Sequence, residues 1–453
     1  MKSSYYFMLC LLCTTTLLAQ SNNIEQNNNS SKSQKKSVAL DVGINNLYHY
    51  GNEPIYLYAD VTATKDVPKL ERKPLNIALV IDRSGSMRQD GKLENVKKAA
   101  NFIIDNLTKD DYLSIVVYDD EMSVLRKAAK VHRADGIKQK VQNVSSGGST
   151  NLSGGMLEGY KQVKSVFNKN YVNRVLLLSD GLANEGITDI EKLKKIVSEK
   201  NTKDNISIST FGVGVNYNES LMTPLAELGN GNYYFIEKAD AIGEIFKREL
   251  DGLFSVVAQN VRLVMEFPDD KLKVSKVVGA TYIEEGNQII VKYNDLFADA
   301  RRHILVKFEP IANFNKIKIT NTLTYHDVLS NYDRKEVVLK TIEKTKNKKI
   351  YDEHNDTATA FRVAFHDAND VLEDASKAVD NRDYEKAKKM LEENNCFLDE
   401  LFGENKPPEY LRKQYETNKK YFEQIDKLKN ATEQKRKMMQ KRDKESNYMQ
   451  RYF

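Results

Sequence analysis

The chain has 453 residues, of which 29% are charged and 40% hydrophobic, a composition typical of a soluble protein with two or three globular domains. Its formal net charge of +5 is small for this length and gives no reason to expect a nucleic-acid partner. The 6 histidines are scattered and no His-Glu-x-x-His sequence is present, which argues against a zinc hydrolase.

Residues 1–19 have the features of a secretory signal peptide, with Lys2 near the start, a mostly apolar segment and Ala19 before the expected cleavage site. Residues 20–36 are mainly Asn, Ser, Gln and Lys, which predicts a disordered linker. No later apolar run is long enough to span a membrane, so we expect no membrane span in the mature chain. We expect the cleaved protein to be periplasmic or secreted, and membrane-anchored if the signal is retained.

The cysteine content bears on the same question of location. After cleavage Cys396 would be the one remaining thiol, so no internal disulfide could form, which favours a bacterial periplasm over an animal secretory pathway. We expect Cys396 to be a half-buried helix residue and not a reactive thiol.

Residues 37–73 are predicted to form strands. Residues 55–61 alternate their side chains across a strand rich in aromatic and β-branched residues, and residues 38–44 are a candidate partner. Two strands alone make at best a marginally stable hairpin, so these must join other strands of the chain.

Residues 74–254 alternate buried strands with amphipathic helices, which predicts an α/β domain with a mostly parallel sheet covered by helices on both faces. Residues 93–107 show apolar positions at helical spacing. Strands are expected at 112–118, 175–179, 206–213 and 233–236, followed by a closing helix over about 239–254.

Polar residues follow two of these strands at the positions where α/β folds place their ligand sites. Asp82, Ser84 and Ser86 follow the apolar run 77–81, Thr150 ends a polar loop, and Asp180 ends another buried strand. Five oxygen ligands on three loops, without sulfur or imidazole, suit a hard divalent cation such as Mg²⁺, with Mn²⁺ and Ca²⁺ as alternatives. The residues therefore predict a metal site.

This pattern resembles the von Willebrand factor A (VWA) family over about residues 74–254. The family's metal-ion-dependent adhesion site (MIDAS) uses Asp-x-Ser-x-Ser, a Thr on a second loop and an Asp on a third, and each position is matched here. The resemblance implies a Rossmann-like VWA domain that captures a carboxylate of a protein partner at the cation. It also implies that Ser84, Ser86 and Thr150 bind the cation directly, with Asp82 and Asp180 acting partly through water.

Residues 255–345 lose the helical period and read as short strands, which predicts a β-sandwich. We expect the strands in 37–73 to join it, so that the VWA domain is inserted in the sandwich. Bacterial envelope proteins of the calcium-activated chloride channel-like type resemble this whole region, and the name implies no pore here.

Residues 356–445 are predicted to form a helical region. Two helices resemble a tetratricopeptide-like pair, although one pair without a repeat is a weak signal. After Pro407 and Pro408 a third, highly charged helix is expected to run to about Lys441. Its basic residues are interpreted as a solvated face, with a patch for lipid or an acidic partner as the alternative.

These observations favour a metal-dependent protein-binding module of the cell envelope, which is not an enzyme. Hydrolysis would need a base beside the metal, and the nearest carboxylates, Glu158 and Glu185, are expected on a helix surface and in a loop. The alternative is a structural scaffold of an envelope complex, in which the metal site is incidental.

Overall fold

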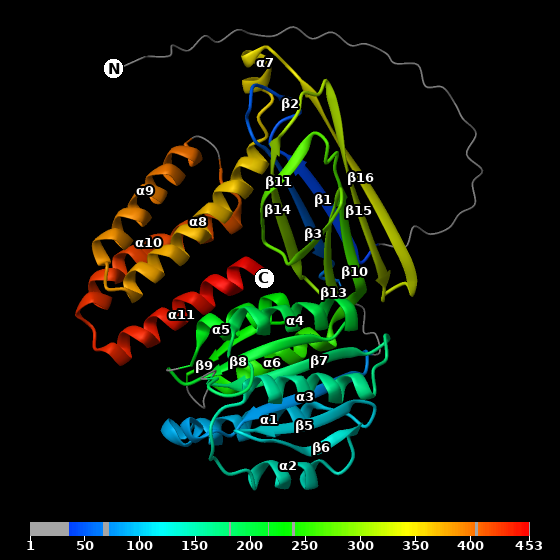
Figure 1. Ribbon diagram of the computed structural model, residues 1–453, viewed down its shortest axis with the longest axis vertical. Helices are drawn as coiled ribbons and strands as arrows, with labels where there is room; N and C mark the ends of the chain where they lie inside the picture. Colours follow the sequence, from blue (N-terminus) through cyan, green and yellow to red (C-terminus); the bar gives the residue numbers. More distant parts are fainter. Residues whose placement is uncertain are drawn as a thin grey trace. The chain divides into compact units, whose positions relative to one another are not determined.

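A computed structural model describes residues 36–66, 72–180, 183–215, 217–237, 241–403 and 406–452 (Figure 1). The predicted signal peptide and residues 20–35 of the predicted linker lie outside these residues. Within them the chain forms an α/β domain, two further β-sheets and a C-terminal set of helices, which confirms the predicted fold class. None of the helices in the described ranges combines the length and the apolar composition needed to cross a membrane.

The α/β domain has a six-stranded sheet in the order β6-β5-β4-β7-β8-β9. Neighbouring strands are parallel except β5 and β6, which are antiparallel at one edge. The strands are β4 (Leu75–Asp82), β5 (Tyr112–Tyr118), β6 (Met122–Lys130), β7 (Val172–Ser179), β8 (Ser207–Val213) and β9 (Tyr233–Ile236). Every residue of β4, β7 and β8 is buried, as expected for strands covered on both faces.

Helices cover both faces of this sheet (Figure 1). Ile77 and Leu79 of β4 share one apolar core with α1 and α6, whereas Ala78 and Val80 share the other with α3 and α5. The helices are α1 (Lys92–Asn106), α2 (Ala134–Gln142), α3 (Leu152–Ser165), α4 (Ile190–Asp204), α5 (Glu219–Leu228) and α6 (Ile242–Phe254), with a 3₁₀ segment η1 (Gly85–Gly91) before α1. The helix expected at 93–107 is thus displaced by one residue.

The other two sheets form the sandwich, with strand orders β1-β3-β14-β11 and β12-β13-β10-β15-β16-β2. Strand β3 lies between β1 and β14, with Ile55 opposite Phe308 and Thr62 opposite Arg301. Strands before and after the α/β domain therefore share a sheet, as predicted. The strands are β1 (Val38–Ile44), β2 (Tyr48–His49), β3 (Ile55–Ala63), β10 (Val256–Glu266), β11 (Leu272–Val278), β12 (Tyr282–Glu285), β13 (Gln288–Phe297), β14 (Arg301–Pro310), β15 (Lys316–Asp327) and β16 (Tyr332–Lys344).

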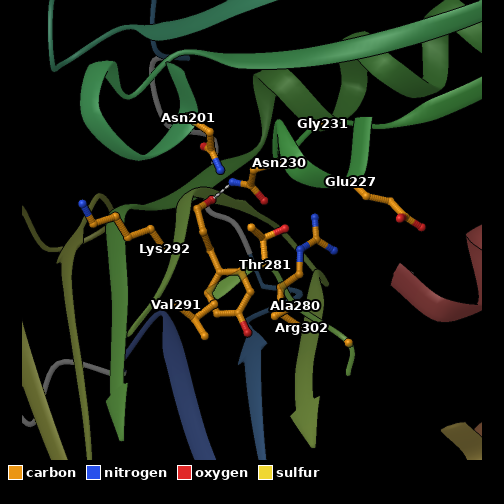
Figure 2. Close-up of a pocket in the computed structure, with 11 residues that line it drawn as sticks. Asn201, Glu227, Asn230, Gly231, Ala280, Thr281, Val291, Lys292 and Arg302 are labelled. Atoms are coloured by element: carbon orange, nitrogen blue, oxygen red, sulfur yellow. Dashed lines mark hydrogen bonds between the residues drawn. The ribbon is translucent and has the colours of Figure 1, made fainter. Parts of the chain in front are cut away.

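Polar contacts join the α/β domain to the sandwich around a small pocket (Figure 2). The side-chain amide of Asn230 donates to the carbonyl oxygen of Tyr293, and that of Asn294 donates to Asn201 Oδ1. Asn230 and Asn294 both have positive φ angles, of 50° and 52°, which asparagine tolerates better than most residues. Lys292 Nζ adds a hydrogen bond of 2.8 Å to the carbonyl of Thr202.

The C-terminal helices are α7 (Lys348–Glu353), α8 (Thr357–Asp380), α9 (Tyr384–Phe402), α10 (Glu409–Asn430) and α11 (Glu433–Tyr452). The single charged helix predicted after Pro408 is wrong, because Ala431 is extended and divides it into α10 and α11. Thr432 then starts the new helix, since its hydroxyl accepts a hydrogen bond from the amide of Lys435.

Two further expectations for this region are corrected. Cys396 is exposed on α9 and not half-buried, because the packed positions of that helix lie beside it at Asn394, Asn395 and Leu398. The basic residues of the last helix are solvated only in part, because Lys435, Lys437 and Arg442 are exposed as expected but Lys441 is not. Lys441 is only 7% exposed, because α11 packs against the α/β domain.

Candidate metal centre

The candidate metal centre lies where β4 and β7 end. These strands are parallel neighbours, so their carboxyl ends meet at the same edge of the sheet. β4 ends at Asp82 and β7 ends at Ser179, which Asp180 follows. Both aspartates are fully buried. Two carboxylates therefore approach each other inside the protein, where a counter-charge is needed.

Asp82 is held by three donors. Its Oδ1 accepts the amide of Ser84 at 2.9 Å, and its Oδ2 accepts the hydroxyls of Ser179 at 2.6 Å and Tyr118 at 3.4 Å. Burial first, and the nearby charge of Asp180 second, raise the pKa of Asp82 to about 6, although the hydrogen bonds from Ser179 and Ser84 act in the opposite direction. The raised pKa means that negative charge is poorly compensated at this end of the sheet.

Ser84 and Ser86 bring two hydroxyls to the same place. Their Oγ atoms are 3.1 Å apart at the start of η1. The loop that carries them is tied to the second loop, because the amide of Gly85 donates to the carbonyl of Gly148 at 3.0 Å and the amide of Gly147 donates to the carbonyl of Arg83 at 2.8 Å. Gly148 has a φ of +70°, a conformation that favours glycine.

Thr150 is fixed through its main chain. Its amide donates to Asn184 Oδ1 at 2.7 Å, and its carbonyl accepts the amides of Asn184 at 3.1 Å and Glu185 at 3.2 Å. The Thr150 side chain is buried at the start of the turn into α3. The second loop is therefore tied to the segment after β7, as well as to the loop of Ser84 and Ser86.

Sequence reasoning missed Lys92, the first residue of α1. Lys92 Nζ donates to Asp180 Oδ2 at 3.0 Å, and the residue is 3% exposed. A lysine is unfavourable at a helix N-terminus, where the helix dipole favours negative charge, so a buried lysine there needs a carboxylate partner. A lysine at the first position of a predicted helix was therefore the signal by which sequence reasoning could have found this residue. Ser179 and Tyr118 were also missed, since neither belongs to the recognised motif.

The donors present fit a divalent cation. Asp180 Oδ1 is buried and has no hydrogen-bond partner among the described residues, although Oδ2 is paired with Lys92. Lys92 is paired with Asp180, and the three donors to Asp82 are uncharged, which leaves negative charge for a cation to neutralise. Within the described ranges no three His, Cys, Asp or Glu side chains converge, so a cation here would depend on hydroxyl oxygens as well as carboxylates.

The two carboxylates considered as catalytic bases lie where they were expected. Glu158 is on α3 and accepts hydrogen bonds from Lys161 at 3.0 Å and Gln162 at 2.8 Å. Glu185 is exposed in the loop that contacts the main chain of Thr150.

Comparisons with known proteins agree with this geometry. Residues 76–248 match the von Willebrand factor type A domain. The uncharacterized protein YfbK of Escherichia coli K12 is 31% identical over 269 residues, which cover 58% of this chain and 46% of YfbK. Human inter-alpha-trypsin inhibitor heavy chain H3 is 25% identical over 248 residues, 51% of this chain and 27% of the human protein. The chain thus spans about half or less of the length of these two relatives.

Two solved structures share the fold well beyond the matched domain. A von Willebrand factor type A protein from Catenulispora acidiphila has a TM-score of 0.67 at 15% identity, covering 85% of this chain and 90% of its own. The ArnB paralog VWA2 from Sulfolobus acidocaldarius has a TM-score of 0.62 at 17% identity, covering 92% and 98%. Residues 76–248 therefore form a von Willebrand factor type A domain, which suggests a protein-interaction module, and the chain is similar to YfbK and to the inter-alpha-trypsin inhibitor heavy chains over about half of its length.

Proposed function

We propose that this protein is a metal-dependent protein-binding module of the cell envelope. It would capture an Asp or Glu carboxylate of a protein partner at a divalent cation held by residues of the three loops. Those residues are Asp82, Ser84, Ser86, Thr150 and Asp180. The observation that carries the proposal is the buried Oδ1 of Asp180, which has no hydrogen-bond partner in the described parts of the chain and lies beside a second buried carboxylate.

The hydrogen bonds of the site favour a division of roles among these residues. Asp82 already accepts three hydrogen bonds, so its oxygens are less available to a cation than the serine hydroxyls. Ser84 and Ser86 contribute no charge, so a bound cation would keep enough Lewis acidity to attract a partner's carboxylate. Lys92 holds Asp180 in place and reduces the net negative charge of the cluster.

Titration calorimetry tests the metal site directly. We expect wild-type protein to bind one Mg²⁺ or Mn²⁺ more tightly than Zn²⁺, because every donor is an oxygen atom. Thr150→Ala should weaken this binding with an unchanged circular dichroism spectrum. Zn²⁺ binding that is tighter than Mg²⁺ binding and survives this substitution would refute the proposed site.

Partner capture separates this proposal from its rival, a structural scaffold in which the metal is incidental. The sandwich and helices outside the VWA domain give the rival its support, since they make up more than half of the chain. An envelope extract passed over immobilised protein with Mg²⁺ or with a chelator distinguishes the two. Metal-dependent capture that Thr150→Ala abolishes supports carboxylate binding, and equal capture by both proteins supports a scaffold.

We also propose that the protein acts in the periplasm and is not an enzyme. Glu158 is engaged by two neighbours on α3, and Glu185 is exposed on its loop, so neither is positioned as a shielded base. A tag after Phe453 and cell fractionation would locate the protein and show whether residues 1–19 are removed. We also propose that the protein is related to the bacterial envelope proteins of the calcium-activated chloride channel-like type.

A further inference from the structure

Helix α11 lies against the edge of the VWA sheet, far along the chain from it (Figure 1). Its contacts come from Lys441, Arg442 and Glu445, which share one side of the helix because residues three and four apart are neighbours there. The strand that they approach is β9, the last strand of the sheet.

Lys441 is the centre of this contact. Its Nζ donates to the carbonyl of Tyr217 at 2.8 Å and lies 3.5 Å from the centroid of the Tyr217 ring. Glu219 Oε2 is 3.8 Å away. A lysine that is 7% exposed must keep such partners, because an unpaired buried ammonium group is costly.

The neighbouring residues extend the contact along the sheet edge. Arg442 Nε donates to Glu237 Oε2 at 2.7 Å, and Glu445 Oε1 accepts the main-chain amide of Phe235 at 3.1 Å. Glu445 therefore provides an acceptor for a main-chain amide of β9, the strand at the edge of the sheet.

Residues on either side of Tyr217, which Lys441 contacts, also contact the candidate metal centre. The amide of Asn218, next to Tyr217, donates to the carbonyl of Asp180 at 2.9 Å. Gly214, on the other side of Tyr217, has a φ of +75°, and a Cβ there would lie 2.7 Å from Lys92 Cε. Gly214 and Asn218 thus touch both members of the Lys92–Asp180 pair.

The chemistry of the contact suits a helix that docks and releases. α8 packs through apolar residues such as Phe361, Phe365 and Leu372, whereas α11 reaches the VWA domain through charged side chains. The Arg442–Glu237 pair, whose arginine side chain is 56% exposed, is the kind of ionic contact that salt weakens and that adds little net stability. The extended residue Ala431 separates α11 from α10, so the two helices are not one continuous rod.

α11 is also tied to the rest of the helical region. Gln440 Nε2 donates to Asp380 Oδ1 on α8 at 2.7 Å, one residue before Lys441. A protein that binds α8–α10 could thus change the docking of α11, and the change would reach Asp180 through Tyr217 and Asn218.

We propose that α11 is a releasable latch that couples the metal centre to the C-terminal helical region. In its docked state it fixes Tyr217 and Asn218, and so preorganises Asp180 for the cation. Because coupling between two sites is reciprocal, a bound cation must strengthen the docking of α11 by the same factor. The proposal rests on the proposed function, since it assumes that the centre binds a divalent cation.

Lys441→Met tests the latch, because methionine keeps the length of the side chain and removes its charge and donors. Lys437→Met is the matched control, since Lys437 is one turn earlier on α11, exposed, and paired with Glu433 of the same helix. Two quantities are measured on the full mature chain. Hydrogen exchange followed by mass spectrometry reports on the peptide containing Tyr217 and Asn218, and calorimetry reports the affinity for Mn²⁺.

We expect Lys441→Met to speed exchange in that peptide and to weaken Mn²⁺ binding roughly fivefold, with no change in Lys437→Met. Mn²⁺ should also slow exchange in α11 of the wild type. Unchanged exchange, or faster exchange with unchanged Mn²⁺ affinity, would overturn the latch. Failure of the wild type to bind Mn²⁺ or Mg²⁺ at all would overturn the proposed function instead, a result that is visible before any variant is compared.

Discussion

Strand β7 has a buried ion pair at each end, and the two pairs differ in how completely their carboxylates are satisfied. Near the start of the strand, Arg174 pairs with Glu249 of α6, with Nη1 3.2 Å from Oε1. Glu249 also accepts hydrogen bonds from Ser209 at 2.7 Å, Asn232 at 2.7 Å and Tyr234 at 3.0 Å. Just past the other end, Asp180 pairs with Lys92 and keeps one oxygen without a partner among the described residues.

From this difference we infer that the Arg174–Glu249 pair is structural and that the Lys92–Asp180 pair belongs to the proposed cation site. Each carboxylate oxygen of Glu249 accepts two hydrogen bonds, so neither oxygen is left for a cation to bind. Asp180 lacks a donor and lies beside Asp82, whose pKa is raised by burial. Both ion pairs are buried, but only the carboxylate of Glu249 has all its hydrogen bonds. Removing one charged residue from each pair should show which pair depends on an added cation.

Glu249→Ala should have the largest effect on stability. It leaves the Arg174 guanidinium buried without its counter-charge, which costs about 3–5 kcal/mol of unfolding free energy. Denaturant unfolding measures the loss, and Mg²⁺ should not restore it. Glu244→Ala is the control on the same helix, since Glu244 is exposed and pairs only weakly with Arg248 at 3.4 Å. A loss below 1 kcal/mol in Glu249→Ala would contradict the assignment of a complete structural pair.

Lys92→Met should cost slightly less and should respond to metal. Without divalent cations, buried Asp180 loses its ammonium partner beside a second buried carboxylate, Asp82, and we expect a loss of about 3 kcal/mol. Millimolar Mg²⁺ should recover most of it, because a cation at the same edge replaces the missing charge. The comparison would break if Mg²⁺ stabilised Glu249→Ala as much as Lys92→Met.

Mg²⁺ itself should stabilise the wild-type protein through mass action. At a free concentration of one hundred times Kd the gain is about 2.7 kcal/mol, which thermal unfolding detects as a higher Tm. Thr150→Ala should unfold near the wild-type temperature in chelator, since the main-chain contacts of Thr150 remain, and should gain much less from Mg²⁺. Equal gains in the two proteins would remove Thr150 from the metal site.

The sequence predicted the sheet and the candidate loops because both depend on local patterns. The run 77–81 is apolar throughout and ends in Asp82, so strand, strand end and polar side chain could be located together. The insertion in the sandwich also followed from a local fact, namely that residues 38–44 and 55–61 cannot be stable alone. In the structure, β3 pairs with β14, about 240 residues later.

The rest depends on contacts between distant residues, which no local pattern contains. Lys92 is ten residues from Asp82, and its unfavourable place at a helix N-terminus indicates that it needs a carboxylate but not which one, until Asp180 is found beside it. Lys441 likewise appears solvated until α11 turns at Ala431 and meets Tyr217. The position of a charged residue depends on partners that are distant in the sequence, whereas the burial of an apolar run can be predicted from the run itself.

Asp60, whose side chain is 14% exposed, provides another carboxylate with which to test the rule. Asp60 of β3 pairs with Arg362 of α8, and its Oδ1 is buried without a hydrogen-bond partner among the described residues. Its neighbours include Asp41 and Arg301 but no pair of serine hydroxyls like that at the metal centre. Burial raises the pKa of Asp60 to about 6. We therefore expect its oxygen without a partner to take up a proton and not a metal ion.

The smallest predicted effect is therefore a pH dependence at Asp60. A carboxyl group whose pKa is higher in the folded than in the unfolded protein binds more protons when folded, so its contribution to stability increases as pH falls towards about 4. Between pH 7 and pH 5 this contribution is about 1 kcal/mol. Asp60→Asn removes the titrating group, so the difference in unfolding free energy between wild type and variant should shift by that amount in favour of the wild type at pH 5.

An identical pH dependence in the two proteins would mean that Asp60 is fully satisfied by Arg362. A buried oxygen without a hydrogen-bond partner would then not indicate that a carboxylate can bind a further proton or cation. Mg²⁺ should leave this difference unchanged, because the cation belongs to the carboxylates that lie beside hydroxyls.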